Sequence, residues 1–245
     1  MHSLGFAIRT LTRLPIGSKP LEDEEKSLKW FPLVGLIYGA VGWAIAHLCF
    51  PPAVLAALII GSWAYLSRGF HLDGLADFSD GLGGGFTAER TLEIMRDVHI
   101  GAFGALALIV VLLIQYSTLT TLVAAPLSVL LVPLISRSMI ALSAATLPYG
   151  RAGTGSAQKL VSGAKARHSL IVAGQLVVVG VLVWLWGREA LLYGYLWAVG
   201  FATLTTLVVL RITKKRIGGL TGDVLGAIAT LSECAALVGF VLPLA

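Results

Sequence analysis

Two long stretches of the sequence contain no Asp, Glu, Lys or Arg, and they constrain the fold more than any other feature. Residues 30–67 and 101–136 are uncharged and mainly apolar. A membrane-spanning helix needs ~20 such residues, and Pro51-Pro52 divides the first stretch into two segments that we expect to span. Only 13% of the 245 residues are charged, against roughly 25% in soluble domains. The pattern predicts an all-α integral membrane protein.

The remaining apolar segments bring the expected number of transmembrane helices to about seven. The second stretch continues to residue 147 with a turn expected at Pro126, and three more segments follow at 169–187, 190–210 and 223–245. No internal repeat or low-complexity tract separates a second domain. Residues 1–245 are therefore expected to form a single polytopic membrane domain.

The N-terminal 29 residues contain no apolar core long enough for a cleavable signal peptide. Leu4, Ile8 and Leu11 follow helical spacing, which is typical of a short helix lying on the membrane surface. Cys49 and Cys234 both lie in apolar runs, so we expect them to be reduced packing residues.

Lys and Arg are distributed unevenly among the connections, and this predicts which side each connection faces. Residues 1–29, 68–100, 148–167 and 211–222 carry five, three, four and four of them, whereas the intervening connections carry none, none and one. Because basic loops stay in the cytoplasm, we expect the N-terminus and all four basic regions there. The same rule explains the net charge of +5 without a nucleic-acid partner.

An acidic segment stands out against this apolar background. Asp73, Asp77 and Asp80 are spaced by four and three residues, which places them on one face of a helix. Six of the 13 acidic residues fall within 73–97. Carboxylate oxygens are the ligands that Mg²⁺ prefers, and Mg²⁺ often shares its shell with substrate phosphates. We therefore expect a Mg²⁺ site here; a solvated acidic helix is the alternative.

A second acidic row, Glu89, Glu93 and Asp97, follows a glycine-rich break at 83–85. Thr87 is the expected N-cap of the helix that carries the row. Flanking arginines favour a solvated, ion-paired face over a second set of metal ligands. Asp97 is the exception that we retain as a substrate-binding candidate, because it lies nearest the following membrane segment.

His71 and His99 bracket the acidic segment. A histidine can act as a base near neutral pH, and His71 is our catalytic candidate. A hydrogen-bonded structural histidine is the alternative.

Two glycine-rich basic segments are expected on the same side of the membrane. Residues 148–167 include Arg151 and can hold phosphate through backbone N–H groups and cations, although topogenic charge alone would explain them. Gly218, Gly219 and Gly222 precede Asp223 at a helix start, which suits anion binding or a metal ligand; Asp223 as an N-cap is the alternative. We expect segments 68–100, 148–167 and 211–223 to converge on one site.

Two charged residues lie inside predicted spans. Arg137 is ten residues from Leu147, and Glu233 is ten residues from Asp223, so both lie roughly 15 Å along their helices. A charge at such a depth costs ~2.5–3.5 kcal/mol. We expect Arg137 and Glu233 to pair inside the bundle or to line the floor of a polar cleft.

Several motifs resemble the cobalamin synthase family, the adenosylcobinamide-GDP ribazoletransferases. The most specific is FHLDGLADFSDG at 70–81 followed by LEIMRDVHIGAFGALAL at 92–108. TRLP at 12–15, FPLVGL at 31–36, the SR pair at 136–137 and GGLTGDVLGA at 218–227 extend the resemblance over nearly the whole chain.

The resemblance implies a Mg²⁺-dependent enzyme of the bacterial cytoplasmic (inner) membrane that acts in the last steps of cobalamin biosynthesis. It would transfer the cobinamide phosphate of adenosylcobinamide-GDP to α-ribazole or α-ribazole 5′-phosphate and release GMP. The bilayer and these two substrates are the expected partners, and a homo-oligomer is compatible with this function. The metal ligands would be Asp73, Asp77 and Asp80; the catalytic residues Asp77, Asp80, Asp223 and His71; and the substrate-binding residues Arg137, Arg151, Gly218, Gly219, Gly222 and Asp97.

Two other functions are compatible with parts of the sequence. Asp77, Asp80 and Gly81 match the opening of the CDP-alcohol phosphotransferase motif, but Gly84-Gly85 replaces the Ala-Arg expected next. Membership in that family is disfavoured, while another membrane phosphoryl or prenyl transferase is the main alternative. A cation transporter would distribute carboxylates through its spans, and here only Glu233 lies within one.

Overall fold

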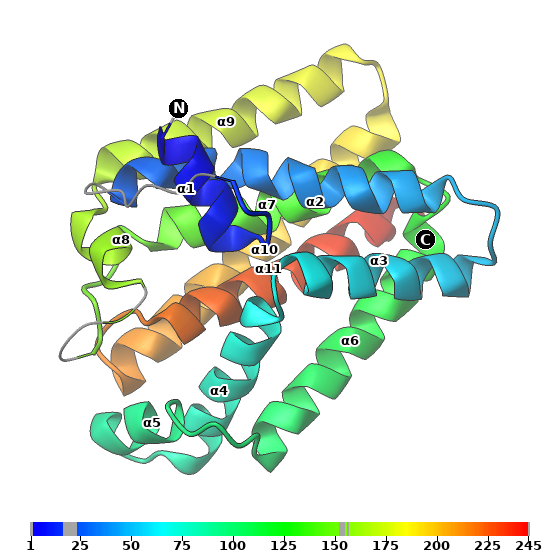
Figure 1. Ribbon diagram of the computed structural model, residues 1–245. Coiled ribbons are helices and arrows are strands. Elements are labelled where there is room, and N and C mark those ends of the chain that lie inside the picture. The colour runs from blue at the N-terminus through cyan, green and yellow to red at the C-terminus, as the bar shows by residue number, and fades with distance from the viewer. Residues whose placement is uncertain (1, 17–23, 152–154, 156, 245) are drawn as a thin grey trace.

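The computed structural model describes residues 2–16, 24–151, 155 and 157–244, and the regular elements within these residues are helices (Figure 1). The prediction of an all-α membrane protein is confirmed. The elements are α1 (His2–Leu11), η1 (Glu24–Trp30, a 3₁₀ helix), α2 (Phe31–Ala46), α3 (Pro52–Leu66), α4 (Phe70–Gly84), α5 (Ala88–Ile94), α6 (Ala102–Leu122), α7 (Pro126–Ser143), α8 (Gln158–Gly163), α9 (Ala166–Leu185), α10 (Glu189–Arg216), α11 (Gly222–Val241) and η2 (Leu242–Leu244).

Six helical segments in the described part of the chain are long and apolar enough to cross a membrane, and a seventh crossing depends on a bent pair. The predicted second span has the expected bounds but is short, because α3 has only 15 residues, and α4 follows it at an angle of 86°. The break lies at Arg68 and Gly69, which both have positive φ. The predicted number of about seven therefore holds when α3 and α4 count as one broken span.

Two other predicted boundaries were wrong. The basic segment 211–222 was expected to be a loop, but α10 extends through Arg216 and carries all four cations of this segment on its last helical turns. The second acidic row was expected on one helix, but α5 ends at Ile94 and leaves Asp97 in the following loop. Thr87 is the N-cap of α5, as predicted, and its hydroxyl accepts a hydrogen bond from the Arg90 N–H.

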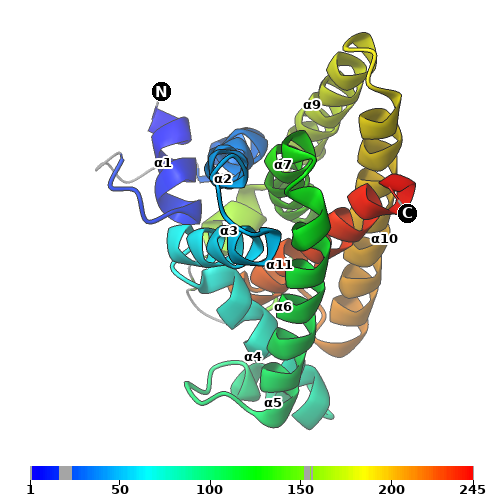
Figure 2. The same ribbon diagram turned by 90° about the vertical axis from the view of Figure 1, so that its right-hand side faces the viewer.

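Helices α7 and α11 form the centre of the bundle, where they pack against each other and against α2, α4, α6 and α10 (Figures 1 and 2). They are the most buried of the long helices, whereas α6 and α9 expose most of their apolar surface. Leu113 on α6 and Leu182 on α9 are examples of exposed leucines. Such an exposed apolar surface is what a lipid-facing helix requires.

Close contact between α2 and α7 depends on two glycines. A Cβ atom at Gly39 would overlap the Leu130 backbone oxygen. A Cβ atom at Gly35 would lie 2.4 Å from the Pro133 backbone oxygen and 2.7 Å from the Pro133 carbonyl carbon. Small residues of this kind let helix backbones approach closely in membranes. The FPLVGL motif therefore has a packing role.

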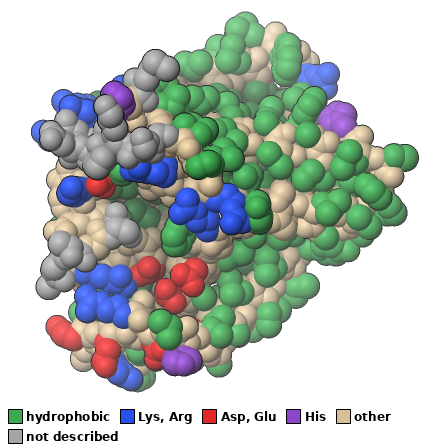
Figure 3. Space-filling view, in the orientation of Figure 1, with side chains coloured by type: hydrophobic (Ala, Val, Ile, Leu, Met, Phe, Trp, Pro, Cys, Tyr) green, Lys and Arg blue, Asp and Glu red, His purple; other side chains and the backbone are tan. Residues whose placement is uncertain are grey.

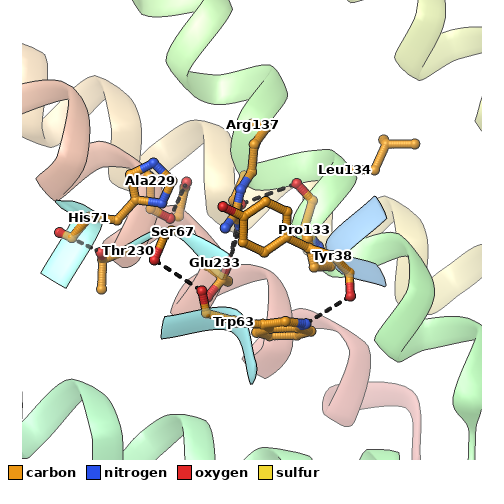
Figure 4. A network of polar contacts seen from close by, with 12 residues as sticks. Tyr38, Trp63, Ser67, His71, Pro133, Leu134, Arg137, Ala229, Thr230 and Glu233 are labelled. Atoms are coloured by element: carbon orange, nitrogen blue, oxygen red, sulfur yellow. Dashed lines mark hydrogen bonds and ion pairs between the residues drawn. The ribbon is translucent and has the colours of Figure 1, made fainter. Parts of the chain in front are cut away.

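A polar network lies inside this bundle (Figure 4). The Arg137 guanidinium on α7 forms an ion pair with the Glu233 carboxylate on α11, and only 2% of the Arg137 side chain is exposed. Gln115 on α6 donates to the same carboxylate at 3.2 Å, and the Arg137 guanidinium carbon lies 4.1 Å from the centre of the Tyr38 ring on α2. The predicted pairing of Arg137 and Glu233 is confirmed.

A Gly39→Ala substitution is expected to destabilise the protein by about 1–3 kcal/mol, because the added methyl group forces α2 and α7 apart. The melting temperature in detergent should fall accordingly. Gly61→Ala is the matched control, since a Cβ there meets nothing within 4 Å. Equal melting temperatures for the two variants would contradict the packing role.

Removal of one charge from the buried pair should be strongly destabilising. Arg137→Met leaves the Glu233 carboxylate unpaired, which is expected to cost about 3–5 kcal/mol. Adding Glu233→Leu removes that isolated charge and should recover much of the loss. A double variant that melts no higher than Arg137→Met would contradict the coupling.

Candidate active site

The charged side chains gather at one end of the molecule, while apolar side chains cover most of the rest of this face (Figure 3). A cavity of about 270 Å³ lies at this polar end. Helices α1, α2, α4, α7, α8 and α11, together with η1, contribute to its wall. Its polar lining includes Asp73, Asp223, Glu24 and His71, and its aromatic lining consists of Phe6, Phe31 and Phe70.

Two glycines bring α4 against the beginning of α11. A Cβ at Gly74 would meet the Asp223 backbone and the Gly226 Cα at 2.8–3.2 Å, and one at Gly226 would meet the Phe70 oxygen at 3.1 Å. Each glycine weakens its own helix, but a larger residue at either position would press against the partner backbone. This contact places Asp73 beside Asp223, and both line the cavity.

Asp77 lies at the centre of the acidic group. The carboxylates of Asp73, Asp80 and Asp223 are all near enough to repel its charge, and the Arg151 guanidinium is near enough to attract it. Asp73 is exposed, whereas Asp77 is half-buried. The predicted carboxylate face on one helix is therefore present, with Asp223 added from α11.

The group does not form a complete set of protein ligands. Among the described residues, no three His, Cys, Asp or Glu side chains lie close enough together to hold a metal ion. Mg²⁺ is commonly bound by only one or two carboxylates, with waters and substrate phosphates as its other ligands. Asp73 and Asp77 fit this open kind of site, and the assignment of Mg²⁺ stays a prediction.

Asp80 has a structural role that the sequence did not indicate. Its Oδ2 accepts a hydrogen bond from the Gly101 N–H at 2.7 Å, and its Oδ1 accepts one from the Gly104 N–H at 2.9 Å. Asp80 therefore satisfies free N–H groups at the start of α6, where negative charge is stabilised. Its predicted metal-binding and catalytic roles stay predictions and would have to coexist with these two bonds.

The two glycine-rich segments meet through their backbones. The Gly150 N–H donates to the Leu220 oxygen at 2.8 Å, and the Leu220 N–H donates to the Pro148 oxygen at 2.7 Å. Gly219 permits this contact, because a Cβ there would lie 2.6 Å from the Pro148 oxygen. The expected convergence of segments 68–100, 148–167 and 211–223 is thus seen in the described residues.

This backbone pairing positions Arg151 next to Asp223. The Arg151 guanidinium lies 2.6 Å from Asp223 Oδ2, and about a fifth of each side chain is exposed. The same guanidinium group donates to the Met95 oxygen at 3.3 Å, just beyond α5. Residues from three separate segments therefore meet at Arg151.

The glycines near Asp223 have different functions. Gly218 has φ of +84° and lies in the turn after α10. Gly219 makes close backbone contact with residues 148–150. Gly222 begins α11 and lines the cavity.

The alternative that Asp223 is the N-cap is wrong, because Thr221 is the N-cap and accepts a hydrogen bond from the Val224 N–H at 3.3 Å. The Asp223 carboxylate instead forms an ion pair with Arg151, and Asp223 lines the cavity.

His71 lines two cavities. One is the cavity at the polar end, and the other is an internal cavity of about 20 Å³ next to Arg137 and Glu233. The latter is about large enough for one water molecule. The His71 backbone oxygen accepts a hydrogen bond from Thr230 on α11 (Figure 4). Its catalytic role stays a prediction.

Arg137 and Asp97 were both predicted to bind substrate, and their contacts are with the protein itself. Arg137 is enclosed by Glu233, Ser136 and Tyr38. Asp97 accepts hydrogen bonds from the backbone N–H and the ring of His99, and these contacts hold the pKa of its carboxyl below the usual range. The substrate-binding roles of Arg137 and Asp97 stay predictions.

Sequence reasoning missed Arg216 and the aromatic wall of the cavity. The Arg216 guanidinium at the end of α10 donates to the Leu82 and Gly85 oxygens at 2.9 and 2.5 Å and caps the C-terminus of α4. The sequence signal for Arg216 was a cation in the last turn of a long helix. The Gly85 oxygen that Arg216 contacts lies 131 residues away in sequence, so the contact could not be predicted. The phenylalanines gave no periodic signal, because they come from three different helices.

The sequence also matches known proteins over almost its full length. A family model described as cobalamin-5-phosphate synthase matches residues 3–241. Proteins named adenosylcobinamide-GDP ribazoletransferase from Ectopseudomonas mendocina and Chlorobaculum tepidum are each 38% identical to the chain. The first alignment covers 98% of both chains, and the second covers 96% of this chain and 93% of the relative. The protein of that name from Pseudomonas fluorescens is 40% identical over 97% of this chain and 98% of its own.

No solved structure matches the chain. The family match and the relatives both extend across every helix that contributes to the polar site. The chain therefore belongs to the cobalamin-5-phosphate synthase family of membrane enzymes.

Proposed function

We propose that the protein transfers the cobinamide phosphate of adenosylcobinamide-GDP to α-ribazole or α-ribazole 5′-phosphate. A ribose hydroxyl of the acceptor attacks the phosphorus that is linked to cobinamide. The bond from this phosphorus to the bridging oxygen breaks, and GMP leaves with that oxygen. Where the acceptor carries a 5′-phosphate, a hydroxyl other than the 5′-hydroxyl must attack, because the 5′ oxygen is already esterified.

One observation carries the proposal: the carboxylates of α4 meet Asp223 and Arg151 beside a cavity at the polar end. Phosphoryl transfer depends mainly on positioning and on neutralisation of phosphate charge. Oxygen ligands on one side and a guanidinium on the other are suited to that task. The names of the relatives support the same reaction, since they contain adenosylcobinamide-GDP as donor and a ribazole as the transferred partner.

Mg²⁺ is the proposed cofactor, and Asp73 and Asp77 would hold it. When bound, Mg²⁺ would neutralise charge on the substrate phosphates and on departing GMP. Asp223 orients the Arg151 guanidinium through their ion pair, so that its remaining N–H groups can bind phosphate oxygens. The N-terminus of α11 adds backbone N–H groups at Gly222.

The cavity wall supplies the second part of the proposed site. Phe6, Phe31 and Phe70 offer an apolar surface for a flat base, while Asp73 and Asp223 lie on the same cavity. We place the enzyme in the bacterial cytoplasmic membrane with this polar end toward the cytoplasm, in agreement with the concentration of basic residues there.

The direct test uses purified protein with adenosylcobinamide-GDP, α-ribazole and Mg²⁺. Release of GMP together with a corrinoid phosphodiester is the expected result. Addition of a chelator should stop GMP release, and Mg²⁺ in excess should restore it. Absence of GMP release by a folded protein under these conditions would rule out the proposed reaction.

Asp77→Asn is expected to lower kcat/KM about 100-fold or more, which corresponds to about 2.7 kcal/mol of lost transition-state stabilisation. The amide is nearly isosteric but cannot supply a carboxylate to Mg²⁺. Glu89→Gln on exposed α5 is the matched control and should keep its activity. Full activity of Asp77→Asn would exclude its metal role.

Arg151→Gln should raise the KM for adenosylcobinamide-GDP about tenfold, since a charge-assisted hydrogen bond to phosphate is lost. Arg151→Lys should retain part of the affinity, because its charge remains while the planar guanidinium is lost. Lys215→Gln at the exposed end of α10 serves as the control. Equal KM values for Arg151→Gln and Lys215→Gln would argue against phosphate binding by Arg151.

A further inference from the structure

Two exposed arginines from distant parts of the sequence lie next to the polar cavity. Arg13 follows α1, and its backbone N–H donates to the Leu66 oxygen at the end of α3 at 2.8 Å. The Arg13 guanidinium carbon lies 3.8 Å from the centre of the Tyr65 ring. Arg68 stands two residues beyond Leu66. Both arginines are therefore fixed to the same turn between α3 and α4.

The turn that presents Arg13 is rigid. Thr12 is buried, its hydroxyl donates to the Ile8 oxygen at 2.7 Å, and it accepts a hydrogen bond from the Leu14 N–H at 3.1 Å. The TRLP motif therefore ends α1 and fixes the backbone of the next residue. The stacking on Tyr65 then limits the positions that the Arg13 guanidinium can adopt.

Arg68 has an unfavourable backbone conformation. Its φ of 57° lies in the left-handed region, and it is the only non-glycine residue with positive φ in the described part of the chain. This conformation costs a non-glycine residue free energy, and such residues cluster at functional sites. Gly69 beside it also has positive φ, at 74°. Glycine would suit position 68 better, so the backbone gives no reason for an arginine there.

No ion pair of Arg13 or Arg68 occurs among the residues that the structure describes. The nearby Tyr38 hydroxyl donates to the Leu11 oxygen. Among the described residues, the two cations thus have no carboxylate counter-ion.

Residues close to both arginines in the chain border the cavity, which places the arginines near its edge. Thr10 and Leu11 before Arg13, and Phe70 after Arg68, line the cavity that also contains Asp73 and Asp223. Figure 3 shows a group of Lys and Arg side chains beside a group of carboxylates on this face. Cations at the rim and carboxylates on the wall are the arrangement that a metal-bound phosphate ester would need on its two sides.

We propose that Arg13 and Arg68 form a phosphate-binding pair at the rim of the cavity. This inference rests on the proposed function, in which the ligand is the diphosphate of adenosylcobinamide-GDP. Two guanidinium groups offer several N–H donors to phosphate oxygens. They also neutralise phosphate charge that Mg²⁺, held by one or two carboxylates, does not neutralise. The headgroup phosphate of an anionic lipid has the same chemistry and is the other source of such a ligand.

The test compares Arg13→Gln, Arg68→Gly and the double variant with Arg96→Gln, an exposed arginine outside the cavity. The first measurement is calorimetric binding of inorganic pyrophosphate to the purified protein with Mg²⁺. The second is the KM for each substrate, from GMP release. The third is binding of the protein to nanodiscs with and without phosphatidylglycerol.

Each single variant is expected to weaken pyrophosphate binding about tenfold or more and to raise the KM for adenosylcobinamide-GDP but not for α-ribazole. Arg68→Gly should melt at the same temperature as the wild type or higher, because glycine accepts the positive φ. This combination separates ligand binding from a purely structural role, which would lower the melting temperature and leave the affinities unchanged.

The outcomes distinguish the two ligand sources. Unchanged pyrophosphate binding together with lost preference for phosphatidylglycerol assigns the pair to a lipid headgroup. Retention of both affinities in the double variant overturns the proposal. Pyrophosphate binding requires no turnover, so a wild-type protein that binds pyrophosphate and releases no GMP would exclude the proposed reaction and leave the arginine pair in place.

Discussion

The ion pair between Arg137 and Glu233 is the interaction on which the arrangement of the bundle depends. An isolated charge at this depth would be expensive, so α7 and α11 must bring the two groups together. Gln115 from α6 and the Tyr38 ring from α2 complete the surroundings of the pair. Four helices are thereby fixed relative to one another at a single buried point. Apolar packing alone specifies helix positions less sharply in a membrane, because lipid and side chains are similarly apolar.

The site at the polar end follows from this centre. Asp223 lies in the first turn of α11, ten residues before Glu233 and roughly 15 Å from it along the helix. Gly74 and Gly226 bring α4 into contact with that same end of α11. The backbone pairing of Gly150 with Leu220 then places Arg151 over Asp223. Carboxylates, guanidinium and helix N-terminus meet because α4, the start of α11 and the segment 148–151 come together at this end of the bundle.

Local sequence signals predicted several parts of this site correctly. The four- and three-residue spacing of Asp73, Asp77 and Asp80 indicated a shared helix face, and the Thr87 cap followed from local chemistry. The match in depth between Arg137 and Glu233 was enough to predict their pairing, because the membrane penalises an unpaired charge. The first two inferences depend only on residues within a few helical turns. The third depends on the free-energy cost of an unpaired charge, which applies throughout the hydrocarbon region of the bilayer.

Other features required contacts between distant segments. The break at Arg68 and Gly69, the extension of α10 to Arg216, and the hydrogen bonds of Asp80 with Gly101 and Gly104 have no sufficient local cause. By itself the sequence determined the membrane class, the apolar spans and the shared face of the acidic helix, since these depend on hydropathy and helical periodicity. Only the tertiary structure decided which carboxylate anchors α6, which ones face the cavity and which arginine pairs with Asp223, because those roles depend on where distant segments meet in space.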